Sequence, residues 1–145
     1  MKPIDVVEML HWAIQARDWD TVALVYGSDA TYQDPEVSIR GGEAILKRAK
    51  ALEAPFSDVS YEILGALENG SRVAVEWRYR ATNHHPITVA DGVDLPATGK
   101  RVEVRGMSVF EVEGEKIVDE HAYWDDYQLY HDLGLVPAVG LFGSW

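Results

Sequence analysis

Apolar residues recur every three or four positions over the first third of the chain, the spacing of one buried helix face. The first such stripe contains Val6, Leu10 and Ala13, and it follows a proline that suits a first helical turn. Asp18 is placed to cap a second, shorter helix. The pattern predicts helices over residues 3–17, 19–26 and 43–52 and a short strand over 30–34.

From residue 59 onward the chain changes to runs rich in β-branched and aromatic residues, which are typical of strands. Tight turns at 68–70 and 113–115 join these runs into hairpins. The pattern predicts strands over 59–67, 72–83, 101–112 and 117–124, a loop over 84–99 and a helical turn over 127–133. A single α+β domain covering residues 1–145 follows, with helices packed across a curved antiparallel sheet to form a cone with an internal pocket.

The strand over 72–83 has two contrasting faces. Its apolar face, interpreted as pocket lining, consists of Val73, Val75, Trp77, Tyr79 and Ala81. Its charged face carries Glu76, Arg78 and Arg80 and is either solvated or paired across a neighbouring subunit. The tail 136–145 is apolar and is expected to pack against its own domain or a partner chain. We therefore expect a homodimer through the charged face, with the tail as additional cover.

Composition narrows the class of partner. The 145 residues carry a net charge of −11, which argues against binding to nucleic acid or anionic membranes. No apolar run approaches the roughly 20 residues of a membrane helix. Acidic residues stand near the N-terminus where a signal peptide would be apolar, so a cytoplasmic protein is expected. The aromatic content favours a pocket for a small hydrophobic molecule.

Two acids follow two large rings at the end of the last predicted strand, in the run Tyr123, Trp124, Asp125 and Asp126. A carboxylate held against an apolar wall has a raised proton affinity, which suits acid–base chemistry. One of the two acids also stands where it would cap the helical turn that follows. We expect Asp125 to face the pocket and Asp126 to act as the cap, although the pattern leaves open which acid takes which role.

Three further side chains are candidates for proton transfer. Asp34 ends a short strand on the same face as Tyr32, and it stands before a proline, where a turn aspartate is equally common. His121 alternates with Tyr123 and Asp125, so all three are expected to point the same way. A histidine beside a carboxylate suits a proton relay.

Metal and cofactor sites are not expected. His84 and His85 are adjacent, so on an extended chain they point to opposite sides and cannot both join His121 as ligands.

Several motifs resemble the cone-shaped α+β superfamily of nuclear transport factor 2, scytalone dehydratase, ketosteroid isomerase, limonene epoxide hydrolase and the SnoaL-like polyketide cyclases. The resemblance is carried by Asp29–Pro35, Arg40–Ile45, Ala97–Gly106 and the ending Asp125…Leu133-Gly134. It extends over residues 5–135, and the SnoaL-like group is most similar.

The resemblance implies roles residue by residue. In SnoaL-like cyclases an aspartate at the position of Asp125 removes a proton from the carbon next to a carbonyl. Asp34 matches the base of ketosteroid isomerase. That enzyme's two oxyanion donors have no counterpart at Leu10 and around Met107, which argues against steroid isomerisation. The Asp–Arg–Asp set of limonene epoxide hydrolase is also absent.

Two functions follow. The first is an enzyme that uses cofactor-free acid–base chemistry, namely cyclisation, isomerisation, dehydration or hydrolysis, on a neutral hydrophobic carbonyl compound or epoxide. The second is a non-catalytic protein that holds an apolar ligand in the same cone. The expected catalytic residues are Asp125, Asp34, His121 and Tyr32. The expected substrate-binding residues are Trp12, Trp77, Tyr79, Met107 and Tyr123, with the loop 83–99 closing the pocket. Convergence of Asp34, His121 and Asp125 on one point would favour the enzyme.

Overall fold

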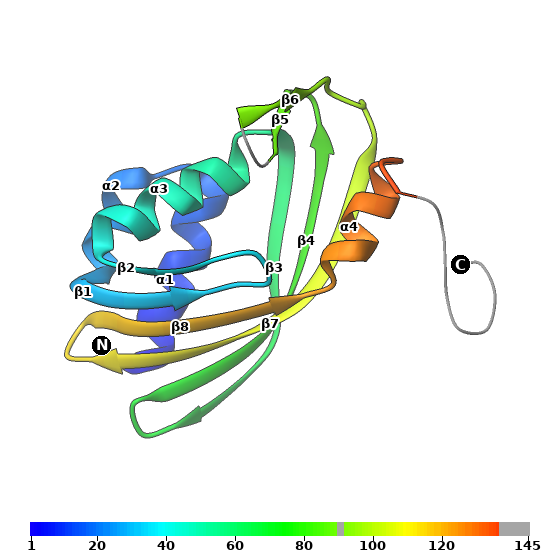
Figure 1. The fold of residues 1–145 in the computed structure, drawn as a ribbon. Helices are drawn as coiled ribbons and strands as arrows, with labels where there is room; N and C mark the ends of the chain where they lie inside the picture. Colours follow the sequence, from blue (N-terminus) through cyan, green and yellow to red (C-terminus); the bar gives the residue numbers. More distant parts are fainter. Residues whose placement is uncertain (90–91, 137–145) are drawn as a thin grey trace.

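The structure is a computed structural model that describes residues 1–89 and 92–136 (Figure 1). Its elements are α1 (Pro3–Ala16), α2 (Trp19–Val25), β1 (Tyr26–Gln33), β2 (Ser38–Arg40), α3 (Gly42–Glu53), β3 (Phe56–Asn69), β4 (Arg72–Asn83), β5 (Ile87–Thr88), β6 (Asp94–Leu95), β7 (Arg101–Glu113), β8 (Lys116–Trp124) and α4 (Asp126–Asp132).

The first two helices are delimited by local signals. Asp5 caps the start of α1, where its side chain accepts a hydrogen bond from the backbone N–H of Lys2. Arg17 ends the helix in the left-handed conformation, with φ of 55°. Asp18 then caps α2 by accepting from the N–H of Thr21. The predicted bounds of the three N-terminal helices are therefore confirmed to within one or two residues.

Six strands form one curved sheet in the order β2-β1-β8-β7-β4-β3. All neighbours are antiparallel except β1 and β8, which run parallel, so the sheet is mixed where the sequence predicted a purely antiparallel one. The two strands can run parallel because α3 and four strands of the sheet, β2, β3, β4 and β7, lie between β1 and β8 in the chain. Strand β2 is absent from the prediction because its three residues are too short to show a period.

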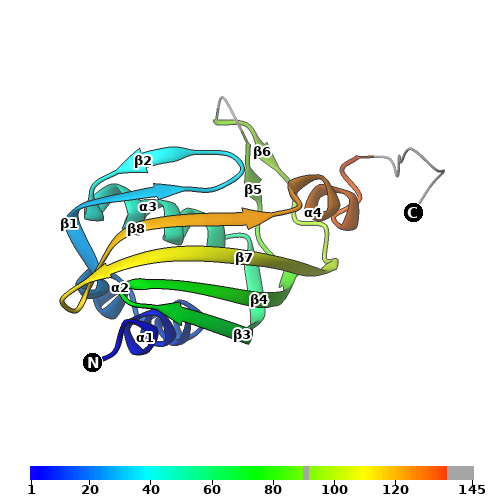
Figure 2. The same ribbon diagram turned by 90° about the horizontal axis from the view of Figure 1, so that it is seen from below.

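The helices α1, α2 and α3 cover the concave face of the sheet, and the convex face is left open (Figures 1 and 2). This arrangement confirms the predicted α+β class. Burial alternates along β4 as predicted, with Trp77 and Tyr79 turned inward and Glu76 outward. Inward side chains from β4, β7 and β8 pack against the helices and form the core.

The convex face is rich in ion pairs. Arg78 and Arg80 both contact Glu62 on β3, at 3.2 and 2.8 Å, and Arg78 also lies 3.8 Å from Glu103 on β7. These partners are within one chain, so Arg78 and Arg80 form ion pairs without a second subunit. Of the tail expected to add cover, residues 137–145 lie outside the described part of the chain.

The loop expected over residues 84–99 contains the short hairpin of β5 and β6. Asn83 holds the two ends of this loop together. Its side-chain N–H groups donate to the carbonyls of Pro55 and His85, and its Oδ1 accepts from the N–H of Thr98 at 2.7 Å. Among the described residues, no helix is long and apolar enough to cross a membrane.

Candidate functional site

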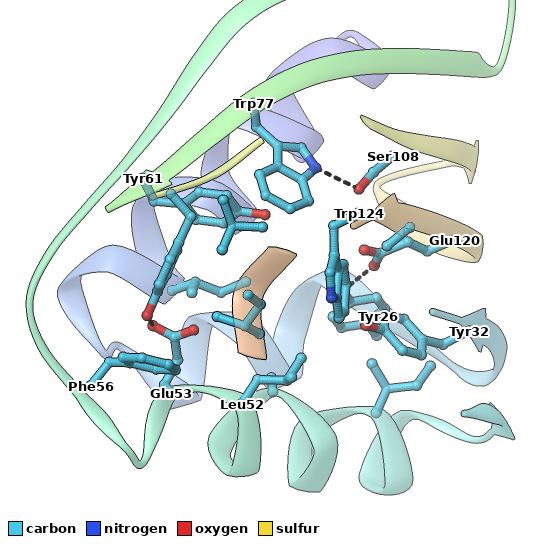
Figure 3. A pocket seen from close by; sticks show the side chains of 17 residues that line it. Tyr26, Tyr32, Leu52, Glu53, Phe56, Tyr61, Trp77, Ser108, Glu120 and Trp124 are labelled. Atoms are coloured by element: carbon cyan, nitrogen blue, oxygen red, sulfur yellow. Dashed lines mark hydrogen bonds between the residues drawn. The ribbon is translucent and has the colours of Figure 1, made fainter. Parts of the chain in front are cut away.

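A cavity of about 120 Å³ lies between the helices and the concave face of the sheet (Figure 3). Its wall consists of Ile14, Tyr26, Tyr32, Ile45, Ala49, Leu52, Glu53, Phe56, Tyr61, Trp77, Tyr79, Val104, Ser108, Glu120, Ala122, Trp124 and Leu129. Most of these side chains are apolar, and polar atoms reach the cavity at only a few points. Such a wall accepts a small hydrophobic ligand and fixes its orientation at those points.

Aromatic rings shape one side of the cavity. The Tyr61 ring meets Trp77 and Tyr79 edge to face, with centroid distances of 5.5 and 5.6 Å. Trp77 in turn meets Trp124 at 6.2 Å. The Trp77 indole N–H donates to Ser108 Oγ at 3.0 Å, and a side-chain carbon at Gly106 would collide with the indole ring. The rings are therefore fixed by mutual packing and form a preorganised wall.

Glu120 is a buried carboxyl on the inner face of β8. The hydroxyl of Tyr26 donates to its Oε1 at 2.5 Å. The described residues offer no hydrogen-bond partner to Oε2, which is directed toward the cavity in Figure 3. Burial raises the pKa of Glu120 to about 7, although the Tyr26 hydrogen bond lowers it, and the charge of Asp34 raises it further. The side chain can therefore take up or release a proton near neutral pH.

Glu53 is a second buried carboxyl, at the last residue of α3. The hydroxyl of Tyr79 donates to its Oε1 at 2.9 Å. Burial raises the pKa of Glu53 to about 7, while the Tyr79 hydrogen bond and the charge of Arg17 lower it. In Figure 3, Glu53 and Glu120 stand on opposite sides of the cavity, with Trp124 between them.

The hydroxyl of Tyr61 points into the cavity (Figure 3). Within residues 1–89 and 92–136 it has no hydrogen-bond partner, and burial is the main cause that raises its pKa well above the ordinary value. Its ring is fixed on the far side by His11, whose centroid lies 4.4 Å away. Tyr61 thus offers an uncommitted, neutral donor to a ligand.

The family model described as the SnoaL-like domain matches residues 6–120. The chain belongs to the SnoaL-like family.

Solved structures with low sequence identity share this fold. IdmH from Streptomyces antibioticus, a proposed polyketide cyclase, is 23% identical with a TM-score of 0.76, covering 92% of this chain and 99% of its own. An epoxide hydrolase of the LEH-like kind from M. tuberculosis is 23% identical with a TM-score of 0.70, covering 90% of this chain and 88% of its own. A proposed SnoaL-like polyketide cyclase from Jannaschia sp. CCS1 is 16% identical with a TM-score of 0.79 and covers 93% of both chains. No curated protein matches this chain.

The structure places three of the expected aromatic residues, Tyr32, Trp77 and Tyr79, in the cavity wall of this SnoaL-like domain. The expected position of Trp12 is wrong: it is 60% exposed, because the buried stripe of α1 runs through Leu10 and Ala13 and leaves Trp12 on the solvent side. The described residues of the loop 83–99 contribute nothing to the wall, and residues 90–91 of the loop lie outside the described part of the chain, so the expected closure stays a prediction. The loop folds on itself through β5 and β6.

Asp34 is buried beside the cavity but is not part of its wall. Arg48 holds it with two hydrogen bonds of 2.9 and 3.2 Å, and Tyr32 donates to it at 2.8 Å. The backbone N–H groups of Glu36 and Val37 donate to its Oδ1. These five bonds occupy the carboxylate and leave little capacity to accept a substrate proton. Asp34 therefore serves to fix the turn and the Tyr32 ring.

Three expected site residues lie on the convex face. Met107 and Tyr123 are 46% and 57% exposed and stand opposite each other on β7 and β8. His121 is half-exposed, 3.3 Å from Asp119. Their expected place in the pocket is wrong, because alternation on β8 turns Glu120 and Ala122 inward and His121 and Tyr123 outward. On β7, alternation likewise turns Ser108 inward and Met107 outward.

Of the two acids at the end of β8, Asp125 takes the capping role expected of Asp126, and neither acid lines the cavity. Asp125 is exposed and caps α4, its Oδ1 accepting from the N–H of Gln128 at 3.0 Å. Asp126 instead accepts from the Trp124 indole N–H at 3.0 Å. Burial, followed by a hydrogen bond with Glu36, raises the pKa of Asp126 to about 6. Asp34, His121 and Asp125 thus do not converge on one point.

Sequence reasoning missed Glu120 and Glu53, although the sequence carries a signal for each. Ala122 and Trp124 are the apolar alternates of β8, and they set the phase that turns Glu120 inward. Glu53 follows Ile45 and Ala49 at helical spacing on the buried face of α3. Tyr26, Tyr61 and Ser108 gave no signal that separates pocket lining from core. In the part of the chain that the structure describes, no group of three acids or histidines is placed to hold a metal ion.

Proposed function

We propose that this SnoaL-like protein is an enzyme that moves a proton on the carbon next to the carbonyl of a neutral, apolar compound. The observation that carries the proposal is Glu120, a buried pocket carboxyl with one oxygen bound by Tyr26 and the other open to the cavity. A base works best when its pKa lies near the working pH. The pKa of Glu120, raised to about 7 mainly by burial, meets that condition.

In this mechanism, Oε2 of Glu120 accepts the proton from the carbon next to the carbonyl, and the electron pair of the broken C–H bond moves to the carbonyl oxygen. The Tyr61 hydroxyl donates a hydrogen bond to the enolate oxygen that results. Glu120 then returns the proton to another carbon, which isomerises the compound. Alternatively, the enolate carbon attacks a second carbonyl and closes a ring, and the alkoxide formed from that carbonyl takes the proton back from Glu120. Both outcomes conserve atoms and charge without a further reactant.

The lining supports a neutral ligand. Among the described residues, the wall carries two carboxyls and no lysine or arginine, so an anionic ligand would be repelled. The apolar rings favour a hydrophobic body, and proton transfer beside them proceeds away from bulk water. The fold is shared with a proposed polyketide cyclase, a name that fits enolate chemistry.

The test uses hydrogen–deuterium exchange into 2-indanone, a small ketone with acidic protons next to its carbonyl, followed by proton NMR in D₂O. Wild type should accelerate exchange, and Glu120→Gln should reduce the protein-dependent rate by about 100-fold or more. Tyr61→Phe should reduce it by about 100-fold through loss of the enolate donor. Asp125→Asn is the matched control, because this residue lies outside the cavity and asparagine caps a helix equally well.

Exchange in Glu120→Gln at the wild-type rate would contradict the base assignment. Saturable binding of 2-indanone without any protein-dependent exchange would instead support the non-catalytic alternative. That alternative is favoured by one observation, namely that Asp34, His121 and Asp125 do not converge.

A further inference from the structure

Glu53 is a second polar point in the cavity that the proposed proton transfer does not use. It lies on the side opposite Glu120 (Figure 3) and is 6% exposed. Burying a carboxyl among apolar side chains costs free energy unless its oxygens find partners. A buried carboxyl in a pocket wall can meet part of this cost by bonding a polar group of a ligand.

Only half of this carboxyl is satisfied. Tyr79 donates to Oε1, and no described residue binds Oε2, which is not enclosed by protein atoms either. Arg17, the cation whose charge acts on Glu53, donates instead to the backbone carbonyls of Glu53 and Phe56. One carboxyl oxygen therefore remains free to accept a hydrogen bond from a ligand.

Charge restricts the class of group that fits there. A ligand carboxylate would meet the Glu53 carboxylate, and a ligand ammonium would meet the charge of Arg17, which already acts on Glu53. A neutral hydroxyl meets neither penalty. It would donate to Glu53 Oε2 and could accept from the Glu53 carboxyl when that group is protonated.

We propose that the Glu53 end of the cavity is a specificity site for an alcohol hydroxyl, so that the substrate is a hydroxy ketone with its hydroxyl remote from the reacting carbonyl. This inference rests on the proposed function, which orients the carbonyl toward Glu120 and Tyr61. The rings between the two ends would hold the hydrophobic body that joins the two groups.

Two one-ring ketones of nearly equal size test the proposal. 4-(Hydroxymethyl)acetophenone and 4-ethylacetophenone differ only in a hydroxyl in place of a methyl group. A purely apolar pocket would favour the ethyl compound by about 10-fold, because the hydroxyl loses its water. Wild type at about pH 8, where Glu53 is mostly ionised, should favour the hydroxymethyl compound by about 10-fold in NMR titrations of the Trp77 and Trp124 indole signals.

Variants assign the preference to one side chain. Glu53→Leu should reverse it in favour of the ethyl compound, whereas Glu53→Gln, which keeps an acceptor oxygen, should preserve most of it. Glu120→Gln is the matched change at the other end of the cavity and should leave the hydroxyl preference unchanged. A wild-type preference for the ethyl compound, or no saturable binding of the hydroxymethyl compound at millimolar concentration, would overturn the proposal even if Glu53→Leu did not fold.

The outcome is separable from the proposed function. Exchange into 2-indanone without a hydroxyl preference would leave the base assignment standing and remove the specificity site. A hydroxyl preference that depends on Glu53, without exchange into any of the ketones, would support the binding site and remove the chemistry.

Discussion

Tyr26 donates its hydroxyl proton to Oε1 of Glu120 across 94 positions of the chain. The contact joins the start of β1 to the middle of β8, two strands that run side by side in the sheet. It also orients the carboxyl, because with Oε1 held by Tyr26 the other oxygen is the one left for a ligand. A strand pairing and a proton-transfer group thus depend on the same hydrogen bond.

The two pocket carboxyls should make the protein less stable as the pH rises. The pKa values of Glu53 and Glu120 are each raised to about 7 by burial, above the ordinary value near 4.5. Each group contributes on the order of 3 kcal/mol to the free energy of unfolding. This contribution is fully present below about pH 4.5 and is lost as the pH rises through about 7. His11 acts oppositely, because burial lowers its pKa to about 4, so its contribution is lost as the pH falls toward that value.

Urea denaturation of wild type and Glu120→Gln at several pH values isolates the first effect. The difference in free energy of unfolding between the two proteins should change by a few kcal/mol between about pH 5 and about pH 8. Over this range Glu120→Gln should become more stable relative to wild type, because it has no carboxyl to ionise. Glu113→Gln, at the exposed end of β7, should show no such trend. A pH-independent difference for Glu120→Gln would contradict a buried, protonated carboxyl.

The sequence was informative wherever one face of an element is uniformly apolar. The stripe of Val6 and Leu10 and the alternation of Trp77 and Tyr79 predicted α1 and the inner face of β4, since burial follows directly from such patterns. On β8 the inward face was assigned wrongly, because it was chosen from the chemistry of His121 and Asp125. The apolar Ala122 indicates the opposite face, which is the one that is buried. The bulge between β7 and β8 near Val112 also shifts the alternation, and a single strand does not reveal it.

Asp34 should prove structural when its partner is removed. Arg48→Met leaves a buried carboxylate without its ion pair, since the Asp34 side chain is 0% exposed, and should cost about 3–5 kcal/mol of unfolding free energy. Arg80→Met, which breaks a partly exposed pair with Glu62, should cost less than about 1 kcal/mol. Urea denaturation compares the two, and equal small losses would show that Asp34 does not depend on Arg48.

The capping role of Asp125 predicts a local effect at α4. Asp125→Ala removes the acceptor for the Gln128 N–H and should cost about 1 kcal/mol, while Asp125→Asn should be nearly neutral. Hydrogen exchange of the Gln128 amide should accelerate by about 5-fold in the alanine variant alone. Unchanged protection in Asp125→Ala would mean that the cap does not stabilise this helix.

The convex face of the sheet should mediate a homodimer. Met107 and Tyr123 lie opposite each other there and expose much of their apolar surface beside the ion pairs of Arg78 and Arg80. Light scattering at micromolar concentration should return twice the mass of the chain, and Met107→Glu should shift the mass toward the monomer. A monomer mass for wild type across micromolar concentrations would refute the dimer.

The central claim is that Glu120 holds and releases a proton near neutral pH, and ¹³C NMR of the glutamate side-chain carboxyls measures this without any substrate. Glu120→Gln identifies the signal by its loss, and Tyr26→Phe, which removes a hydrogen bond that lowers the pKa of Glu120, should move the midpoint upward. The account predicts a wild-type midpoint for the pKa of Glu120 of about 7. A midpoint near the ordinary glutamate pKa of about 4.5 would contradict it.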